Sequence, residues 1–141
     1  MSITAVFLNK DGDQFSAQLK RLEDNALESN PLAEGEVLVR IEHSGINYKD
    51  GLAIANRSPV VRAWPMVAGV DGVGTVEYSS SEGHRVVVTG WGLGETHWGC
   101  LAQRASVLPT SNGQVMRRAR LRNGFAEFMR AARQGPSIRR S

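Results

Sequence analysis

The segment from Glu36 to Ser44 largely alternates charged and apolar side chains, and this pattern restricts the fold more than any other feature of the chain. A period of two places successive side chains on opposite faces of a β-strand. One face, formed by Val37, Val39 and Ile41, is predicted to be buried. The opposite face is predicted to be mostly solvated, as is typical of a strand in an antiparallel sheet, and it carries Glu36, Leu38, Arg40 and Glu42.

Other short segments rich in β-favouring residues are separated by turn residues. Thr4–Leu8 and Phe15–Leu19 flank a turn at Asn9–Asp13, which predicts a β-hairpin. Arg85–Gly90 and Leu101–Leu108 have the composition of further strands. Several short strands joined at glycine-rich corners indicate a mainly β fold, a small and irregular β-barrel.

Three glycines, Gly69, Gly72 and Gly74, interrupt an apolar extended run from Met66 to Glu77. Glycine inside a strand pattern indicates the close approach of another backbone or a sharp bend. The cluster also raises the alternative of a dinucleotide-binding fingerprint. However, its spacing is G-x-x-G-x-G and no helix is predicted to follow, so we interpret the run as strand rather than as a phosphate loop.

A row of polar side chains follows the first predicted strand: Asn47, Tyr48, Lys49 and Asp50. Asn47 is a natural N-cap, because its side-chain oxygen can accept a free N–H group of a short helix that starts at Tyr48. Such a cap would also determine where the Tyr48 phenol and the Lys49 ammonium point. Taken alone, this row is explained by ordinary helix capping as well as by a catalytic role.

Composition restricts the broad class of the protein. A chain of 141 residues with 41% hydrophobic content can bury one ordinary core. The single cysteine, Cys100, excludes an internal disulfide and a multi-cysteine zinc site, and it fits a reduced compartment. Neither a leader pattern nor a stretch long enough to span a membrane is present, so a soluble cytoplasmic protein without a membrane partner is predicted.

Charge is distributed unevenly between the two ends of the chain. Residues 1–115 carry 9 Lys+Arg and 13 Asp+Glu, whereas residues 116–141 carry 8 Arg and one acid, Glu127. The acidic body argues against nucleic-acid binding by the body itself. Within 114–134, several apolar residues are spaced for one face of a helix, namely Leu121, Phe125, Phe128, Met129 and Ala132.

A basic amphipathic helix at this end could contact acidic membrane or nucleic acid. The simpler interpretation is an aberrant or truncated C-terminus, for example from a shifted reading frame, because the composition changes abruptly. Asn123 and Gly124 lie inside the supposed helix and weaken it. We therefore expect residues 111–141 to form an Arg-rich tail, helical or disordered.

Three ordered motifs carry a family resemblance: SGINYKD at Ser44–Asp50, PMVAGVDGVGTV at Pro65–Val76, and TGWGLGETHWG at Thr89–Gly99. Together they resemble the N-terminal half of the zinc-independent medium-chain dehydrogenases/reductases, in the branch of acryloyl-CoA reductases and quinone oxidoreductases. The resemblance covers about residues 1–110 and implies a GroES-like barrel with short helices. It also implies a separate Rossmann domain that holds NADPH, and nothing with that pattern follows Thr110.

The resemblance implies that Asn47 and Tyr48 line the catalytic cleft. Tyr48 would donate a hydrogen bond or a proton, and Asn47 would orient the nicotinamide or the acceptor. Lys49 and Arg62 become candidates for binding the cofactor, Arg62 through a phosphate of NADPH or CoA. Helix capping and support, for Lys49 with Asp50, and a solvated surface loop, for Arg62, are the alternatives.

Two further positions are implied at the border of the substrate cleft, Trp91 and His97. For His97, which precedes a tryptophan in a glycine-rich corner, packing and capping are an equal alternative. No metal is expected, since zinc-dependent relatives have Cys where this chain has Asn47 and Gly-His-Glu where it has Gly69–Asp71.

The leading hypothesis is the N-terminal catalytic domain of an NADPH-dependent oxidoreductase that reduces an enone, an acryloyl-CoA-like thioester or a quinone by hydride transfer. Without a cofactor domain, the chain is expected to bind NADPH weakly, to turn over little, and to self-associate through the uncovered interface. The alternative is a non-enzymatic barrel whose basic tail docks on nucleic acid or acidic membrane.

Overall fold

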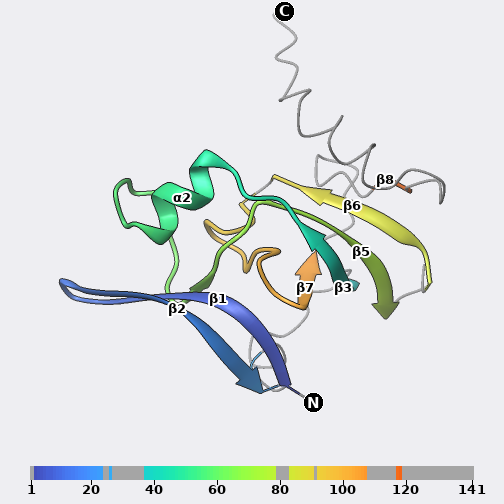
Figure 1. The fold of residues 1–141 in the computed structure, drawn as a ribbon, viewed down its shortest axis with the longest axis horizontal. Coiled ribbons are helices and arrows are strands. Elements are labelled where there is room, and N and C mark those ends of the chain that lie inside the picture. The colour runs from blue at the N-terminus through green and yellow to red at the C-terminus, as the bar shows by residue number, and fades with distance from the viewer. Residues whose placement is uncertain are drawn as a thin grey trace, which may run out of the picture.

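Two antiparallel sheets make up the fold (Figure 1). The computed structural model describes residues 2–23, 26, 37–78, 83–90 and 92–107, and the backbone of 117–118. In Figure 1 the first sheet lies below, the second extends to the right, and helix α2 (Tyr48–Ile54) lies above the first sheet. The strand orders are β2-β1-β4 in the first sheet and β7-β3-β5-β6-β8 in the second.

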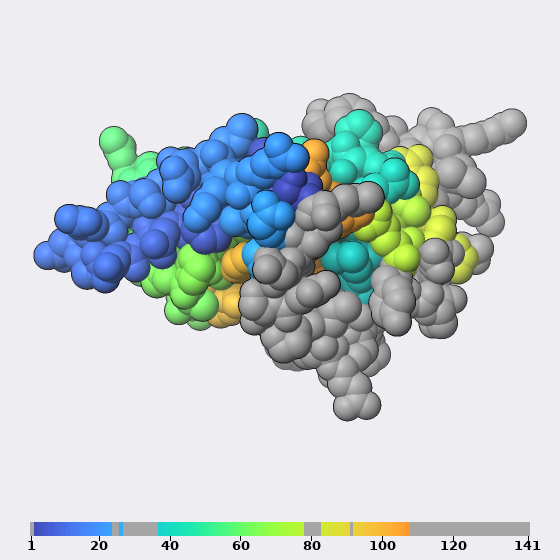
Figure 2. Space-filling view, turned by 90° about the horizontal axis from the view of Figure 1, so that it is seen from below, coloured from blue at the N-terminus to red at the C-terminus, as the bar shows by residue number. Residues whose placement is uncertain are grey.

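A long hairpin forms most of the first sheet. Strand β1 (Ser2–Asp11) pairs with β2 (Gln14–Glu23) along its whole length, and the turn between them has Gly12 at a φ of 57°. The predicted hairpin is therefore confirmed, and both strands are longer than predicted. The short strand β4 (Met66–Val67) pairs with the other edge of β1. Figure 2 shows the hairpin, in blue, forming one end of the molecule.

The second sheet is centred on β3 (Val37–Ser44), the strand predicted from the alternating pattern. It lies between β5 (Asp71–Tyr78) and β7 (Arg104–Val107), and β6 (Arg85–Thr89) pairs with the far edge of β5. Side chains of Val37 and Val39 are buried in the main hydrophobic core. Ile41 packs against that core, so the predicted buried face is confirmed.

Residues 101–103 join the two sheets. The Val6 N–H donates to Leu101 O at 2.8 Å, and the Gln103 N–H donates to Thr4 O at 3.1 Å, so this segment bonds to β1. The Ile41 N–H of the second sheet donates to Gln103 O at 2.8 Å. The strand predicted over 101–108 therefore begins only at 104, because residues 101 and 103 form backbone hydrogen bonds with β1 of the first sheet.

The glycines of the 66–77 run face other backbone or side chains, as predicted. A Cβ atom on Gly74 would lie 2.1 Å from Arg40 O in the neighbouring strand, and one on Gly72 would lie 2.8 Å from Cys100 Cβ. Gly69 has a φ of 111°, and a Cβ there would lie 2.4 Å from the Leu101 nitrogen. The run is two strands, β4 and β5, with no phosphate loop between them.

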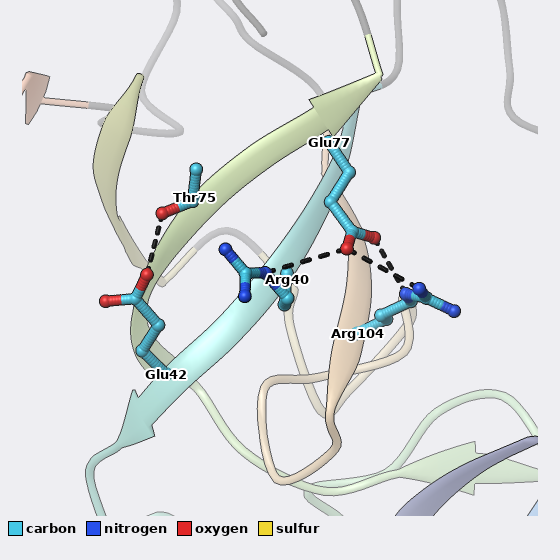
Figure 3. Close-up of polar contacts among 5 residues, drawn as sticks. All are labelled: Arg40, Glu42, Thr75, Glu77 and Arg104. Atoms are coloured by element: carbon cyan, nitrogen blue, oxygen red, sulfur yellow. Dashed lines mark hydrogen bonds and ion pairs between the residues drawn. The ribbon is translucent and has the colours of Figure 1, made fainter. Parts of the chain in front are cut away.

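Charged side chains connect the strands of the second sheet on its solvated face (Figure 3). Arg40 and Arg104 are cross-strand neighbours, and Glu77 of β5 accepts from Arg104 Nε at 2.7 Å and lies 3.6 Å from Arg40 Nε. Glu42 accepts from the Thr75 hydroxyl at 2.7 Å, which is the main cause of the lowered pKa of Glu42. These contacts offset the like charges that face one another across β3 and β7.

The predicted C-terminal tail is described at one place only. Strand β8 (Arg117–Arg118) pairs with β6. The apolar residues Leu121 to Ala132 of the predicted helical face lie outside the described residues. All paired strands in the described part of the chain are antiparallel, so that part contains no βαβ unit of a Rossmann fold. No described helix is long and apolar enough to cross a membrane.

Candidate functional site

Helix α2 begins where the sequence predicts, with Asn47 as its N-cap. Asn47 has extended backbone angles, φ −110° and ψ 165°, and its N–H donates to Asp50 Oδ2 at 2.8 Å. The acid in the first turn thus satisfies the N–H group of the residue before the helix, which is one half of a capping box. The side-chain nitrogen of Asn47, Nδ2, donates to Asp71 Oδ2 at the start of β5.

Asp71 brings three elements together at this point. It lies directly opposite Thr89 in the β5–β6 pair, and the Thr89 hydroxyl donates to Asp71 Oδ1. Its backbone oxygen accepts from the Gly45 N–H at 3.2 Å. Only 8% of Asp71 is exposed, and both carboxylate oxygens have donors. The end of β3, the start of β5 and the end of β6 therefore meet at Asp71, through its carboxylate and its backbone oxygen.

Asp50 is the most deeply buried charged residue of the site, with 2% exposed. Besides Asn47, it accepts from the Val70 N–H at 3.2 Å through Oδ1. Burial raises the pKa of Asp50 above its ordinary value, and the hydrogen bonds from the two backbone N–H groups partly oppose that shift. Asp50 thus ties the N-terminus of α2 to the segment before β5.

The two implied catalytic residues, adjacent in sequence, lie in different environments. Asn47 is half-buried against Asp71, whereas Tyr48 is 84% exposed, as is the nearby Ile46 at 78%. Asn47 therefore has a carboxamide held by a carboxylate, whereas the Tyr48 phenol is open to solvent.

Lys49 forms an ion pair with Glu95. The backbone oxygen of Glu95 accepts from the N–H groups of Arg62, at 2.8 Å, and of Ala63, at 3.2 Å. The structure therefore brings Lys49 and the backbone of Arg62 to the same residue, which the sequence pattern did not reveal. The exposed residue Arg62 remains a candidate for a phosphate contact, while the Lys49 ammonium already has a carboxylate partner.

The predicted border of the substrate cleft is described only in part. Trp91 lies outside the described residues. His97 is exposed, and its Nδ1 is 2.9 Å from the Thr96 hydroxyl. Trp98 packs edge-on against Phe7, with ring centroids 6.1 Å apart, and donates from Nε1 to Pro65 O at 3.0 Å. In this corner, the packing contacts are therefore made by Trp98, the residue after His97.

A mainly apolar pocket of about 480 Å³ borders this corner. Thr96 and Trp98 line it together with residues of the hairpin and of the 63–66 segment, but Asn47, Tyr48 and His97 do not. The pocket is therefore separate from the polar group around Asp71.

Cys100 is fully buried in the main hydrophobic core, and burial is the main cause that raises its pKa to about 12, with Asp71 and Asp50 adding to the shift. Because the thiolate is the reactive form, a rise from 9.0 to about 12 lowers the thiolate fraction at pH 8 about a thousandfold. We expect Ellman's reagent to leave Cys100 of the native chain unmodified over hours. In 6 M guanidinium the Cys100 thiol should react within minutes. Fast labelling of Cys100 in the native chain would contradict this prediction.

Sequence reasoning missed Thr89 and Glu95 as members of this site, and it named Asp71 only within the segment where zinc-dependent relatives have Gly-His-Glu. A further weak signal was present for Asp71, since its carboxylate interrupts the apolar run that starts at Met66. Its partners come from positions 24 residues earlier and 18 residues later, which no local pattern connects. In the described residues, no group of three or more His, Cys, Asp or Glu side chains is arranged to hold a metal ion.

The chain matches a known family of protein domains. The family model of the alcohol dehydrogenase GroES-like domain matches residues 33–135. The acrylyl-CoA reductase AcuI of Ruegeria pomeroyi is 51% identical over 80 residues, 54% of this chain and 24% of that protein. YhfP of Bacillus subtilis, named as a quinone oxidoreductase, is 36% identical over 107 residues, 73% of this chain and 31% of that protein.

Solved structures show the same fold. The structure of Bacillus subtilis YhfP with NAD bound has a TM-score of 0.66 and 33% identity, over 77% of this chain and 33% of that one. Escherichia coli YHDH with bound NADPH has a TM-score of 0.63 and 34% identity, over 82% of this chain and 37% of that one. The chain thus spans about a quarter to a third of the length of the relatives that it matches.

Proposed function

The chain belongs to the alcohol dehydrogenase GroES-like domain family, the N-terminal half of the medium-chain dehydrogenases/reductases, and from this premise we propose that it forms the acceptor-binding half of an NADPH-dependent oxidoreductase. Its acceptor is an activated double bond, as in acryloyl-CoA, or a quinone. The observation that carries this proposal is the half-buried Asn47 carboxamide, bound to Asp71 and adjacent to the exposed Tyr48.

The names of the relatives support the choice of acceptor and cofactor. One relative is named as an acrylyl-CoA reductase and another as a quinone oxidoreductase, and the solved structures hold NAD or NADPH. We propose that the reaction needs no zinc, because the positions of the family's zinc ligands carry Asn47 and Val70, and an amide and an alkyl side chain are poor zinc ligands.

The nicotinamide, when bound, supplies the hydride. In this proposal Asn47 orients the nicotinamide or the acceptor through its carboxamide, and Tyr48 donates a hydrogen bond to the acceptor oxygen, where negative charge develops. The exposed residue Arg62 binds a phosphate of the cofactor or of CoA. Lys49 has a supporting role instead, because its ion pair with Glu95 joins α2 to the 92–97 corner.

A chimera tests this proposal. Residues 2–107 replace the matching segment of Escherichia coli YHDH, and NADPH oxidation is followed with acryloyl-CoA and with a quinone as acceptors. We expect NADPH oxidation with at least one acceptor. Tyr48→Phe should lower kcat about 100-fold, because it removes the donor and leaves the ring.

Thr75→Val is the matched control for the chimera, since it also removes one hydroxyl, but on the solvated face of the second sheet, where Thr75 contacts Glu42. Its kcat should stay within twofold of the parent chimera. A folded chimera that binds NADPH and reduces neither acceptor would contradict the proposal, and so would an activity that a zinc chelator abolishes.

A further inference from the structure

The Asn47 carboxamide can present two different groups to a ligand, a donor nitrogen or an acceptor oxygen, and its orientation decides which. Asn47 Nδ2 lies against Asp71 Oδ2. A carboxylate accepts hydrogen bonds, so the nitrogen must be the end that faces it, and the opposite orientation would set the Asn47 oxygen against a carboxylate oxygen. The contact with Asp71 therefore selects one of the two orientations.

We propose that Asp71, itself held by Thr89, is a positioning residue that keeps the Asn47 nitrogen on the carboxylate, so that the Asn47 carbonyl oxygen, which faces the Asp50 N–H in the capping box, has a second lone pair directed to a hydrogen-bond donor of the bound ligand. The inference rests on the proposed function for the identity of that ligand. The group it selects is a hydrogen-bond donor, and the N–H₂ of a nicotinamide carboxamide has the required chemistry. Neither Asp71 nor Thr89 needs to touch the ligand.

Asp71 suits this role because its own position is well determined. Its Oδ1 accepts from the Thr89 hydroxyl, its Oδ2 accepts from Asn47, and its backbone oxygen accepts from the Gly45 N–H at 3.2 Å. Asp71 and Thr89 are directly opposed in a strand pair, so their separation follows from the sheet. With 8% of Asp71 exposed, little water competes for its oxygens.

The Asn47 backbone is restrained as well. Its N–H donates to Asp50 Oδ2 at 2.8 Å, and Asp50 in turn accepts from the Val70 N–H at 3.2 Å. Val70 directly precedes Asp71, so the segment that carries the positioning carboxylate also binds Asp50, the acid in the first turn of α2. Two residues therefore restrain Asn47: Asp71 binds its side chain, and Asp50 forms a capping box with it that includes the Asn47 backbone N–H.

The test uses the 141-residue chain labelled with ¹⁵N and the NMR signals of the Asn47 side-chain amide. In the native chain, one Nδ2 proton should be shifted downfield, and the amide should exchange with water about tenfold more slowly than those of the exposed residues Asn9 and Asn56. Thr89→Val should reduce this protection and Asp71→Asn should abolish it.

Thr75→Val again serves as the control, because it removes a hydroxyl that donates to a different carboxylate, Glu42, at 2.7 Å. It should leave the Asn47 signals unchanged. If Thr89→Val and Asp71→Asn both fold and both keep the native Asn47 signals, the positioning role is overturned. Thr89→Val retains the Asp71 carboxylate, so the test stands even if Asp71→Asn fails to fold.

A titration with millimolar NADPH separates this inference from the proposed function. We expect NADPH to shift the Asn47 amide signals in the native chain and in Thr75→Val, and to require about tenfold more NADPH in Asp71→Asn. Equal affinity in all three chains would overturn the positioning role. If the variants change the Asn47 signals but the folded chimera binds NADPH and reduces neither acceptor, the positioning role is supported and the proposed function is contradicted.

Discussion

Replacing Gly74 with alanine should cost the fold more than about 3 kcal/mol of unfolding free energy, enough to leave the chain largely unfolded. A Cβ atom at this position would lie 2.1 Å from Arg40 O and 2.8 Å from Arg40 C, both in the backbone of β3. A side chain could turn away, but a backbone carbonyl in a paired strand cannot. The β3–β5 pair at the centre of the second sheet would have to separate. Circular dichroism and urea unfolding measure the effect.

Gly51→Ala provides the control for this prediction. It is the same substitution, in helix α2, and a Cβ there meets nothing within 4 Å. Alanine in a helix is favoured over glycine, so this variant should gain about 0.5–1 kcal/mol. If Gly74→Ala unfolds at the same urea concentration as the parent chain, the close approach of β3 and β5 is wrong.

Asp50→Ala should destabilise the chain by about 2–4 kcal/mol, because two N–H groups lose their acceptor. Those donors belong to Asn47, at 2.8 Å, and Val70, at 3.2 Å, and the Asp50 side chain is almost completely buried. The substitution also removes the cost of burying a charge. The expected loss of stability is therefore smaller than the full cost of leaving two buried N–H groups without an acceptor. Urea unfolding at pH 7 measures the difference.

The matched control for Asp50→Ala is Asp13→Ala, in the exposed hairpin turn, which should change the unfolding free energy by less than about 0.5 kcal/mol. A loss of the same size in both variants would show that Asp50 has no special role.

The pKa of Asp50 adds a pH dependence whose sign follows from its direction. Burial raises this pKa in the folded chain, so the folded state holds the proton more tightly than the unfolded state does. The contribution of Asp50 to stability therefore falls as pH rises through the interval between the two pKa values. Asp50→Asn does not titrate, so the stability of the native chain relative to Asp50→Asn should decrease from acidic to neutral pH. An increase would contradict the raised pKa.

Much of the fold follows from local patterns. The alternation over 36–44 predicted which face of β3 is buried, and Asn47 before Tyr48 predicted the start of α2. Both predictions succeed because side-chain period and helix capping depend on residues that are neighbours in the chain. The strand predicted over 101–108 was too long at its start, because composition does not reveal that residues 101–103 bond to β1 instead.

For the candidate site, the sequence by itself determined the residue types and their order, a capped helix start with Asn47, Tyr48 and Asp50. Only the tertiary structure decided how these side chains are used. It brought Asn47 to Asp71 and Asp71 to Thr89, and it paired Lys49 with Glu95. These partners lie on strands and turns that are far apart in the sequence. Their contact depends on the register of the sheet, which cannot be predicted from the local periodicity of side chains.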